Sequence, residues 1–281
     1  MNPVVSIMAQ GGMGAATAAV LVANGVEVRT IVAGRSLASA ERAKKAGMKP
    51  VTDEELVEVD FILSIVPPAE AIPLAKRLAP FLTKARKKPV YIDLNAVNPD
   101  TAMMVAMTIE PTGAAFVDGG IIGTPPRTGY DGPVYYVSGV EAPRASALTA
   151  FGLKVRVLDA PGCAASALKM SYAGITKGLI ALGTSMILAA ERAGVADALR
   201  TELAASQATL LAGFSRSIPD MFGKAYRWVD EMEQIAAFTG SGRPEHDIYT
   251  AIGRLYDRLG KDFKGPQEEI ATLRSFFPDA K

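Results

Sequence analysis

A lysine within a long apolar stretch is the strongest candidate for chemistry in this chain. Lys169, Tyr172 and Thr176 are spaced i, i+3 and i+7, so they share one face of a helix. Small and apolar neighbours predict that Lys169 is partly desolvated, and desolvation makes a lysine amine a usable proton donor or acceptor near neutral pH. We therefore take Lys169 as the general acid/base and Tyr172 as a second catalytic candidate. The alternatives are a lysine that extends into water, or a role for Lys177 further along the helix.

A glycine-rich turn early in the sequence is the second chemical feature. An apolar run precedes the turn, and an alanine-rich helical stretch and a second apolar run follow it. Strand, glycine turn, helix and strand form a unit that binds a dinucleotide, because glycines let the backbone approach the pyrophosphate and the helix N-terminus supplies N–H groups. Ala9 replaces the expected first glycine, so the motif alone also fits a glycine-rich turn in another α/β protein. The predicted cofactor-binding residues of the turn are Gly11, Gly12, Met13 and Gly14.

The residues after the second apolar run indicate which dinucleotide is bound. Sites for NAD place Asp or Glu about 20 residues after the glycines, where the carboxylate holds the ribose 2′-hydroxyl. This chain has Arg35 and Ser36 there, and Arg42 follows on the next helical stretch. A guanidinium and a hydroxyl suit a 2′-phosphate. We predict NADP(H) as the cofactor; the alternative is that Arg35 is a solvated surface arginine.

Three further segments follow apolar runs, at the ends where ligands bind to open α/β sheets. Val66 and Pro67 are predicted to contact the cofactor. Asn95 is the third catalytic candidate, as a hydrogen-bond partner of the substrate or the nicotinamide carboxamide, or else as a cap for the helix near Pro99. In segment 118–127 the glycines imply close approach to a ligand, or else a tight bend in a strand pair. Its candidate substrate-binding residues are Gly119, Gly120, Ile121, Gly123 and Arg127.

Apolar runs that alternate with helical stretches must position these residues. The alternation predicts a parallel sheet with helices on both faces. The predicted strands are Val4–Ala9, Glu27–Val32, Phe61–Val66, Val90–Leu94, Ala115–Gly120, Val134–Ser138 and Lys154–Val157. The predicted helices among them are Gly14–Asn24, Leu37–Ala46, Ala69–Ala79, Pro99–Thr108 and Ala142–Thr149.

The pattern changes near Pro161, after which we predict helices alone. We therefore place a cofactor-binding domain at residues 1–161 and a helical substrate and dimerisation domain at 162–281. The helix Ala164–Ala193 is too apolar for a solvated surface, and we expect it to be buried between the domains and against a second subunit. The later predicted helices are Ala196–Ser215, Pro219–Ala237, Asp247–Gly260 and Gln267–Phe276.

Composition excludes several classes of function. The chain has 281 residues and a net charge of +1, and its densest basic cluster, Lys84–Lys88, is short, so we expect no nucleic-acid partner. With one cysteine, Cys163, and one histidine, His246, neither an intrachain disulfide nor a cysteine or histidine metal cluster is expected. No signal peptide or membrane span is predicted, because the apolar stretches are interrupted and periodic. We expect a cytoplasmic protein with a small-molecule substrate.

Together these segments resemble the β-hydroxyacid dehydrogenase family, which includes 3-hydroxyisobutyrate dehydrogenase and 6-phosphogluconate dehydrogenase. The matching motifs are G-G-M-G, G-R-S, S-I-V-P, D-L-N, V-D-G-G-I-I-G and K-M-S-Y. The part from K-M-S-Y through R-W-V-D-E-M-E resembles a branch with a phosphogluconate-dehydrogenase-like C-terminal domain. The resemblance implies a doubly wound Rossmann domain and an all-helical domain, a homodimer built on the helices, and hydride transfer at the domain interface. It also implies that Lys169 is the catalytic lysine and that residues 118–123 anchor the substrate.

Three departures from the family pattern bear on the substrate. Ala9 replaces a glycine, I-I-G replaces the usual S-G-G of the substrate loop, and Tyr172 stands where Asn is usual. The lost hydroxyl argues against the short hydroxyacids of the family. Arg127 could bind a carboxylate instead, or be a solvent-exposed loop residue.

Three hypotheses follow from these residues. The first is an NADP-dependent oxidoreductase that acts on a hydroxy acid, a sugar acid or a related carbonyl compound. The second is an imine reductase, which Lys169 argues against and Tyr172 favours. The third is a cofactor-binding sensor without catalysis, which a lysine at the catalytic position argues against.

Overall fold

The computed structural model describes residues 2–8, 10–127, 129–130 and 132–278. The chain forms two compact units, Met1–Met170 (the sheet unit) and Ser171–Lys281 (the helical unit). The two units divide within α7 (Ala164–Arg192), whereas our predicted domain boundary lies before this helix. The first two turns of α7 belong to the sheet unit because they bond to its strands, as described below.

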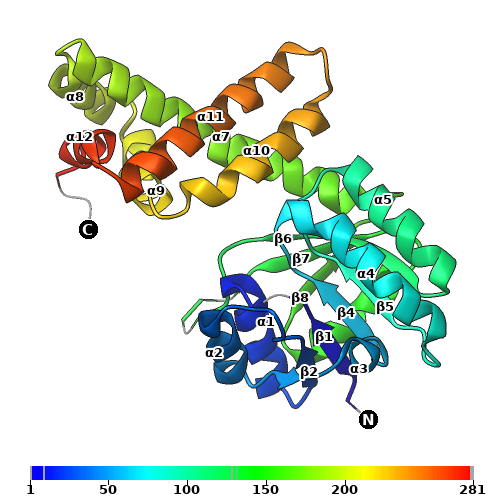
Figure 1. The fold of residues 1–281 in the computed structure, drawn as a ribbon. Helices are drawn as coiled ribbons and strands as arrows, with labels where there is room; N and C mark the ends of the chain where they lie inside the picture. Colours follow the sequence, from blue (N-terminus) through cyan, green and yellow to red (C-terminus); the bar gives the residue numbers. More distant parts are fainter. Residues whose placement is uncertain (1, 9, 128, 131, 279–281) are drawn as a thin grey trace. The chain divides into compact units, whose positions relative to one another are not determined.

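The sheet unit is built on one eight-stranded sheet with the order β3-β2-β1-β4-β5-β6-β7-β8 (Figure 1). Neighbouring strands are parallel except β6 and β7, which are antiparallel. The doubly wound α/β fold predicted from the alternation is confirmed. The strands are β1 Val4–Ile7, β2 Glu27–Thr30, β3 Lys49–Pro50, β4 Phe61–Ser64, β5 Val90–Asp93, β6 Ala115–Ile122, β7 Val134–Ser138 and β8 Lys154–Val157.

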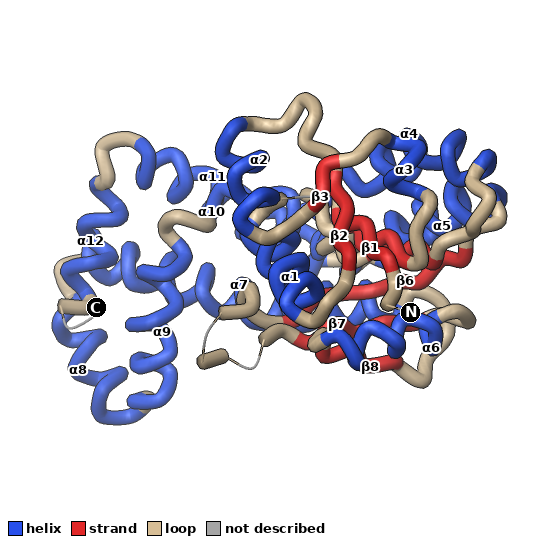
Figure 2. The backbone as a smooth tube through the Cα atoms, turned by 90° about the horizontal axis from the view of Figure 1, so that it is seen from below, coloured by secondary structure: helices blue, strands red, loops and turns tan. Residues whose placement is uncertain are grey.

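Helices cover both faces of this sheet (Figure 2). One apolar core joins the strands to α1 and α2, and a second core joins the opposite face to α3, α4 and α5. The helices are α1 Gly12–Ala23, α2 Leu37–Lys45, α3 Asp53–Val57, α4 Ala71–Lys84, α5 Pro99–Ile109 and α6 Ala142–Ala145, with 3-10 turns η1 Pro68–Glu70, η2 Glu110–Thr112 and η3 Ser146–Phe151. The elements β3 and α3 were not predicted from the sequence.

A row of polar residues crosses four neighbouring strands. Strand register places Ser64 of β4 beside Asp93 of β5, Asp93 beside Asp118 of β6, and Asp118 beside Ser138 of β7. Their exposed fractions are 0, 1, 2 and 0%. We call Ser64, Asp93, Asp118 and Ser138 the polar row. Because buried polar groups need partners, the hydrogen bonds of this row decide what can lie next to it.

The described part of the helical unit contains helices and no strand. After α7 come α8 Ala196–Ser206, α9 Ala208–Met221, α10 Ala225–Thr239, α11 Pro244–Lys264 and α12 Glu268–Phe276. The prediction of one helix over 196–215 is wrong, because the chain breaks at Gln207, which lies between α8 and α9. The predicted helix start at Pro219 is also wrong, since Pro219 lies inside α9. In Figure 1, α10 and α11 form an antiparallel pair.

Helix α7 leaves many apolar side chains uncovered. By length and composition alone it could cross a membrane, and 44% of its most apolar window is buried inside the protein. Ile175, Leu179, Leu182 and Met186 are 71, 46, 57 and 60% exposed. They are spaced i, i+4, i+7 and i+11, so they form one stripe along the helix. Contiguous exposed apolar surface of this kind marks an interaction site.

Candidate active site

The glycine turn opens α1 with free space above its backbone. A β-carbon at Gly11 or Gly12 would meet no atom within 4 Å. Gly11 is the N-cap residue without a side-chain cap, and the first turn of α1 carries no acid. The first N–H groups of a helix have no acceptor within the helix, so this end suits the pyrophosphate of a dinucleotide. Gly14 is buried, Met13 packs against the core, and Ala9 lies outside the described residues.

A buried glutamine, which the sequence analysis missed, holds the glycine turn in place. Gln10 is 2% exposed, and its Nε2 donates to Thr30 Oγ1 and to the Ile31 carbonyl oxygen, at 2.5 and 2.8 Å. Thr30 Oγ1 in turn donates to the Ile7 carbonyl. Arg42 Nε donates to the Gln10 carbonyl oxygen at 2.6 Å. The turn is therefore tied both to the end of β2 and to α2.

The two residues predicted to bind a 2′-phosphate lie at the N-terminus of α2. Arg35 and Ser36 are both exposed. Ser36 is the N-cap, and its Oγ accepts from the Ser39 N–H, while Arg42 Nη2 donates to Ser39 Oγ at 2.9 Å. The first turn of α2 has no acidic residue. Two guanidinium groups, two hydroxyls and a helix N-terminus thus gather here, a combination that suits a phosphate.

Asn95 joins the loops that follow β4 and β5. Its Oδ1 accepts from the Val66 N–H at 2.6 Å, and its Nδ2 donates to Ser64 Oγ at 2.8 Å. It is 2% exposed. The alternative role of capping α5 belongs instead to Asn98, whose Oδ1 accepts from the Thr101 N–H. Asn95 therefore fixes Val66, next to the exposed Pro67, and its contact with a substrate or nicotinamide stays a prediction.

The two carboxyl groups of the polar row have different surroundings. Asp93 Oδ1 accepts from the Asn95 N–H, but Asp93 Oδ2 has no hydrogen-bond partner among the described residues. Burial raises the pKa of Asp93 to about 7, and the neighbouring Asp118 adds to this shift. Burial also raises the pKa of Asp118, but hydrogen bonds from Ser166 and Ser138 oppose the shift. Hydrogen-bond donors thus surround the Asp118 carboxylate, whereas Asp93 keeps one oxygen without a donor among the described residues, which favours its protonated form.

Gly119 and Gly120 allow β6 to pack closely against β5 and α7. A β-carbon at Gly119 would lie 2.8 Å from the Asp93 carbonyl oxygen. A β-carbon at Gly120 would lie 2.9 Å from Lys169 Cβ and 3.0 Å from the Ala165 carbonyl oxygen. The half-buried Lys169 is thus seated on β6 because residue 120 has no side chain. The close approach expected from these glycines serves strand and helix packing; contact with substrate stays a prediction.

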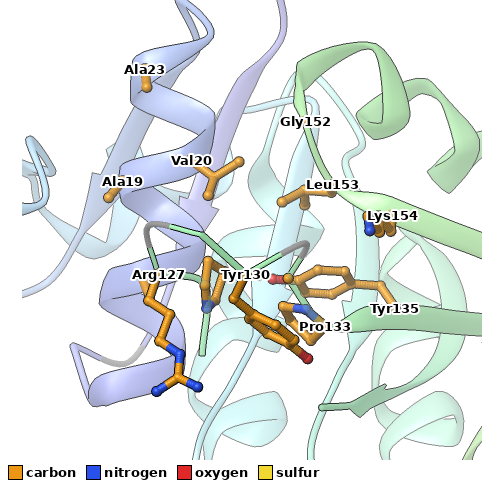
Figure 3. Close-up of a pocket in the computed structure, with 13 residues that line it drawn as sticks. Ala19, Val20, Ala23, Arg127, Tyr130, Pro133, Tyr135, Gly152, Leu153 and Lys154 are labelled. Carbon is orange, nitrogen blue, oxygen red and sulfur yellow. The ribbon is translucent and has the colours of Figure 1, made fainter. Parts of the chain in front are cut away.

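The remaining residues of the predicted substrate loop contact parts of the protein other than Lys169. Ile121 is 6% exposed and packs in the core on the α1 face of the sheet. Gly123 has φ +126°, and a β-carbon there would lie 2.7 Å from the Tyr130 hydroxyl. Arg127 is exposed, and its guanidinium lies 5.8 Å from the centre of the Tyr130 ring. Arg127 and Tyr130 line a cavity of about 410 Å³ beside the later turns of α1, together with Tyr135, Leu153 and Lys154 (Figure 3).

Lys177, the alternative catalytic lysine, forms an ion pair within the helical unit. Lys177 Nζ pairs with Glu231, and their side chains are 14 and 9% exposed. Lys177 also lies 4.9 Å from the centre of the Trp228 ring. The structure thus gives Lys177 a packing role and leaves Lys169 as the candidate acid/base. Tyr172 is 48% exposed and belongs to the helical unit.

In the part of the chain that the structure describes, the single cysteine and the single histidine lie apart from any group that could hold a metal ion. Among the described residues, no group of three or more His, Cys, Asp or Glu could hold a metal ion. Cys163 is half-buried, and burial raises the pKa of its thiol to about 12. His246 lies near the start of α11, and its Nδ1 is 2.9 Å from the Ala236 carbonyl oxygen of α10.

Comparison with known families matches most of the chain. Residues 5–152 match the NAD binding domain of 6-phosphogluconate dehydrogenase, and residues 190–259 match a domain of unknown function, DUF1932. An uncharacterised 28.5 kDa protein in the 7S RNA 5′ region of Methanothermus fervidus is 33% identical over 176 residues. That match covers 62% of this chain and 66% of the relative, just under two thirds of its length.

Solved structures share the fold over nearly the whole chain. The conserved protein MTH1747, of unknown function and similar to 3-hydroxyacid dehydrogenases, is 27% identical with a TM-score of 0.71, covering 93% of this chain and 98% of that one. The 3-hydroxyisobutyrate dehydrogenase of Mycobacterium tuberculosis is 19% identical with a TM-score of 0.73, covering 98% and 100%. An imine reductase of Myxococcus stipitatus has the same fold at 17% identity, with a TM-score of 0.55 and coverage of 98% and 99%.

The orphaned oxygen of Asp93 predicts an unusual pH dependence of stability. A pKa of about 7 in the folded chain exceeds the unfolded value, so the protonated form stabilises the fold at low pH. Stability is then lost as pH rises, by about 1.4 kcal/mol per pH unit until about pH 7. We expect the free energy of unfolding in urea to fall by about 2 kcal/mol between pH 5 and pH 7 relative to Asp93→Asn.

The exposed Asp100→Asn variant is the matched control, because it makes the same chemical change at a residue in contact with solvent. It should follow the wild-type curve from pH 5 to pH 8. Parallel curves for wild type and Asp93→Asn would show that Asp93 is ionised throughout.

Proposed function

Because the chain belongs to the β-hydroxyacid dehydrogenase-like superfamily, and its residues 5–152 match the NAD binding domain of 6-phosphogluconate dehydrogenase, we propose that it is an NADP(H)-dependent oxidoreductase. Its substrate is a small hydroxy acid, a sugar acid or a related carbonyl compound, and Lys169 is the general acid/base. The observation that carries this proposal is the seating of Lys169 on the side-chain-free Gly120 of β6. This brings Lys169 to the carboxyl end of the sheet, where ligands of such folds bind.

The choice of NADP over NAD rests on the N-terminus of α2. A 2′-phosphate carries negative charge, and the exposed Arg35 and Ser36 meet it together with the helix N-terminus. Arg42 is already held by Ser39 and by the Gln10 carbonyl, so little side-chain entropy is lost when the phosphate binds. A carboxylate that would hold a free ribose hydroxyl is missing from the first turn of α2.

The proton chemistry belongs to Lys169. A bound nicotinamide would supply the chemistry of hydride transfer to or from the substrate carbon. As an alcohol is oxidised, its C–H pair leaves as hydride and its O–H bond breaks, so a base must take the proton. The Lys169 amine takes that proton, and it returns the proton to the carbonyl oxygen in the reductive direction.

The second candidate function is imine reduction, which the exposed hydroxyl of Tyr172 favours. A tyrosine can donate a proton to the product amine in the place of a lysine. Activity on cyclic imines but not on hydroxy acids would select it. A sensor that binds NADPH without turnover is the third candidate.

Lys169→Ala tests the acid/base assignment. We expect turnover to fall at least a hundredfold, because general acid–base catalysis contributes roughly 10²–10⁴-fold, while the Kd of NADPH stays within twofold. The assay follows NADPH absorbance over a panel of hydroxy acids, sugar acids and cyclic imines, with NADH in parallel. The exposed Lys76→Ala variant is the control. Undiminished turnover in Lys169→Ala would rule out this residue as the acid/base.

Arg35→Ala tests the cofactor assignment. Loss of one charged hydrogen bond weakens NADPH binding by roughly 10- to 100-fold, and NADH binding should stay unchanged because NADH has no 2′-phosphate. Titration of nucleotide fluorescence measures both Kd values. Lys45→Ala, at the opposite end of α2, is the matched control. Equal effects on the two nucleotides would contradict the 2′-phosphate site.

We also propose that the exposed stripe of α7 is covered by a second copy of the chain, which makes the protein a homodimer. The double variant Leu182→Lys and Met186→Lys should shift the protein from dimer to monomer, because it places two charges within an apolar contact. Light scattering coupled to size exclusion measures the mass. Leu37→Lys, at a residue that is 87% exposed in the sheet unit, is the control. A monomeric wild type would refute the dimer.

A further inference from the structure

We propose that Asp118 is a positioning residue for Lys169: its buried carboxylate caps the first turn of α7 from within the sheet and thereby sets where Lys169 lies on β6. The importance of this for catalysis rests on the proposed function of Lys169. The resemblance to the family places Asp118 at the start of a loop that anchors substrate. The contacts in this chain assign its carboxylate to the protein itself.

Both oxygens of Asp118 are bonded to groups of this chain. Oδ2 accepts from the Ser166 N–H at 2.9 Å and lies 2.8 Å from Ser138 Oγ, and Oδ1 accepts from Ser166 Oγ. Ser138 Oγ also accepts from the Ala165 N–H at 2.9 Å. The first N–H groups of α7 therefore find their acceptors on β6 and β7. With 2% of its surface exposed, Asp118 has little room for a substrate.

A second contact completes the attachment of α7. Asp118 and Gly120 are two positions apart on β6, so they lie on the same face of the sheet. Ser166 and Lys169 are three positions apart on α7, so they lie on the same side of the helix. Ser166 meets Asp118, and Lys169 Cβ meets Gly120. These two contacts lie on the same side of α7 and on the same face of β6. Together they fix both the rotation of α7 about its axis and its position along the strand.

Charge explains why this position holds a carboxylate. α7 has 29 residues and no acid in its own first turn. A helix N-terminus carries partial positive charge, which a carboxylate stabilises, most strongly where water is excluded. Asp118 supplies that charge from another element. The neighbouring Asp93 bonds to Asn95 instead, so the two carboxyls of the polar row hold different parts of the site.

The experiment measures the surroundings of Lys169 without a substrate. Acetic anhydride labels lysine amines, and mass spectrometry gives the rate for Lys169 relative to the exposed Lys76 within the same molecule. We expect Asp118→Asn to change this ratio at least threefold, because the neutral amide lacks the charge and one acceptor. Ser166→Ala, which removes one hydroxyl and keeps the backbone bond, should shift the ratio in the same direction by less.

Asp93→Asn is the matched control: it makes the same chemical change at a buried position of the same row, but touches Asn95 rather than α7. Its Lys169 labelling ratio should equal that of wild type. An unchanged ratio in both Asp118→Asn and Ser166→Ala overturns the proposal, and so does an equal change in Asp93→Asn. Ser166→Ala keeps the test decisive if Asp118→Asn does not fold.

Turnover separates this proposal from the proposed function. With a substrate from the panel, Asp118→Asn should lower kcat at least tenfold and leave the Kd of NADPH within twofold, since the hydrogen bonds of the Asp118 carboxylate go to β7 and α7. If labelling changes but Lys169→Ala keeps full turnover, Asp118 still positions Lys169 and the acid/base assignment fails. If labelling is unchanged and Lys169→Ala is inactive, the acid/base assignment stands and the positioning role fails.

Discussion

Two carboxyl groups that lie side by side in the protein interior impose the main constraint on the sheet unit. Asp93 and Asp118 occupy neighbouring strands, and at most 2% of either residue is exposed. An isolated buried charge is very unfavourable, so each group must be neutralised or surrounded by donors. Asp118 has the donors, which come from Ser138 and the first turn of α7. The attachment of α7 to the sheet thus supplies the hydrogen bonds that stabilise the buried charge of Asp118.

The same constraint links two parts of the site. The loops after β4 and β5 are organised by Asn95, whose backbone is held by Asp93. The start of α7 is organised by Asp118. The polar row therefore places the loop that carries Val66 and the helix that carries Lys169 on a single rigid sheet. Such support from buried groups is what a precise catalytic geometry requires.

Local patterns were sufficient to predict much of the fold. The bounds of β7 and β8 are as predicted, because strand patterns there end at clear turns. The strand β3 was missed because it is two residues long and contains a proline. The helix α3 could have been found, since Thr52 and Glu55 form a capping box. The break at Gln207 has no glycine or proline to mark it, and the antiparallel direction of β7 depends on tertiary pairing.

The site divides in the same way between local and long-range features. The glycine turn and the pair Arg35 and Ser36 are local, and the sequence predicts them by spacing alone. The hydrogen bonds of Asp118 with Ser138 and Ser166 span 20 and 48 positions in the sequence, so no local motif could predict them. Gln10 could have been recognised, because it is a polar side chain between a buried strand and the glycine turn, and a buried polar side chain needs hydrogen-bond partners.

The double contact between β6 and α7 also restricts how the lengths of these segments can vary among related chains. An insertion or deletion of one residue between Ser166 and Lys169 would rotate the lysine by about 100° and move it by about 1.5 Å along the helix. A change of length in the loop that precedes Ala164 would leave both contacts intact. Related chains should therefore keep D-x-G on the strand together with S-x-x-K on the helix, while the distance between the two patterns drifts. This paired spacing can be sought in sequences whose overall identity is too low to align.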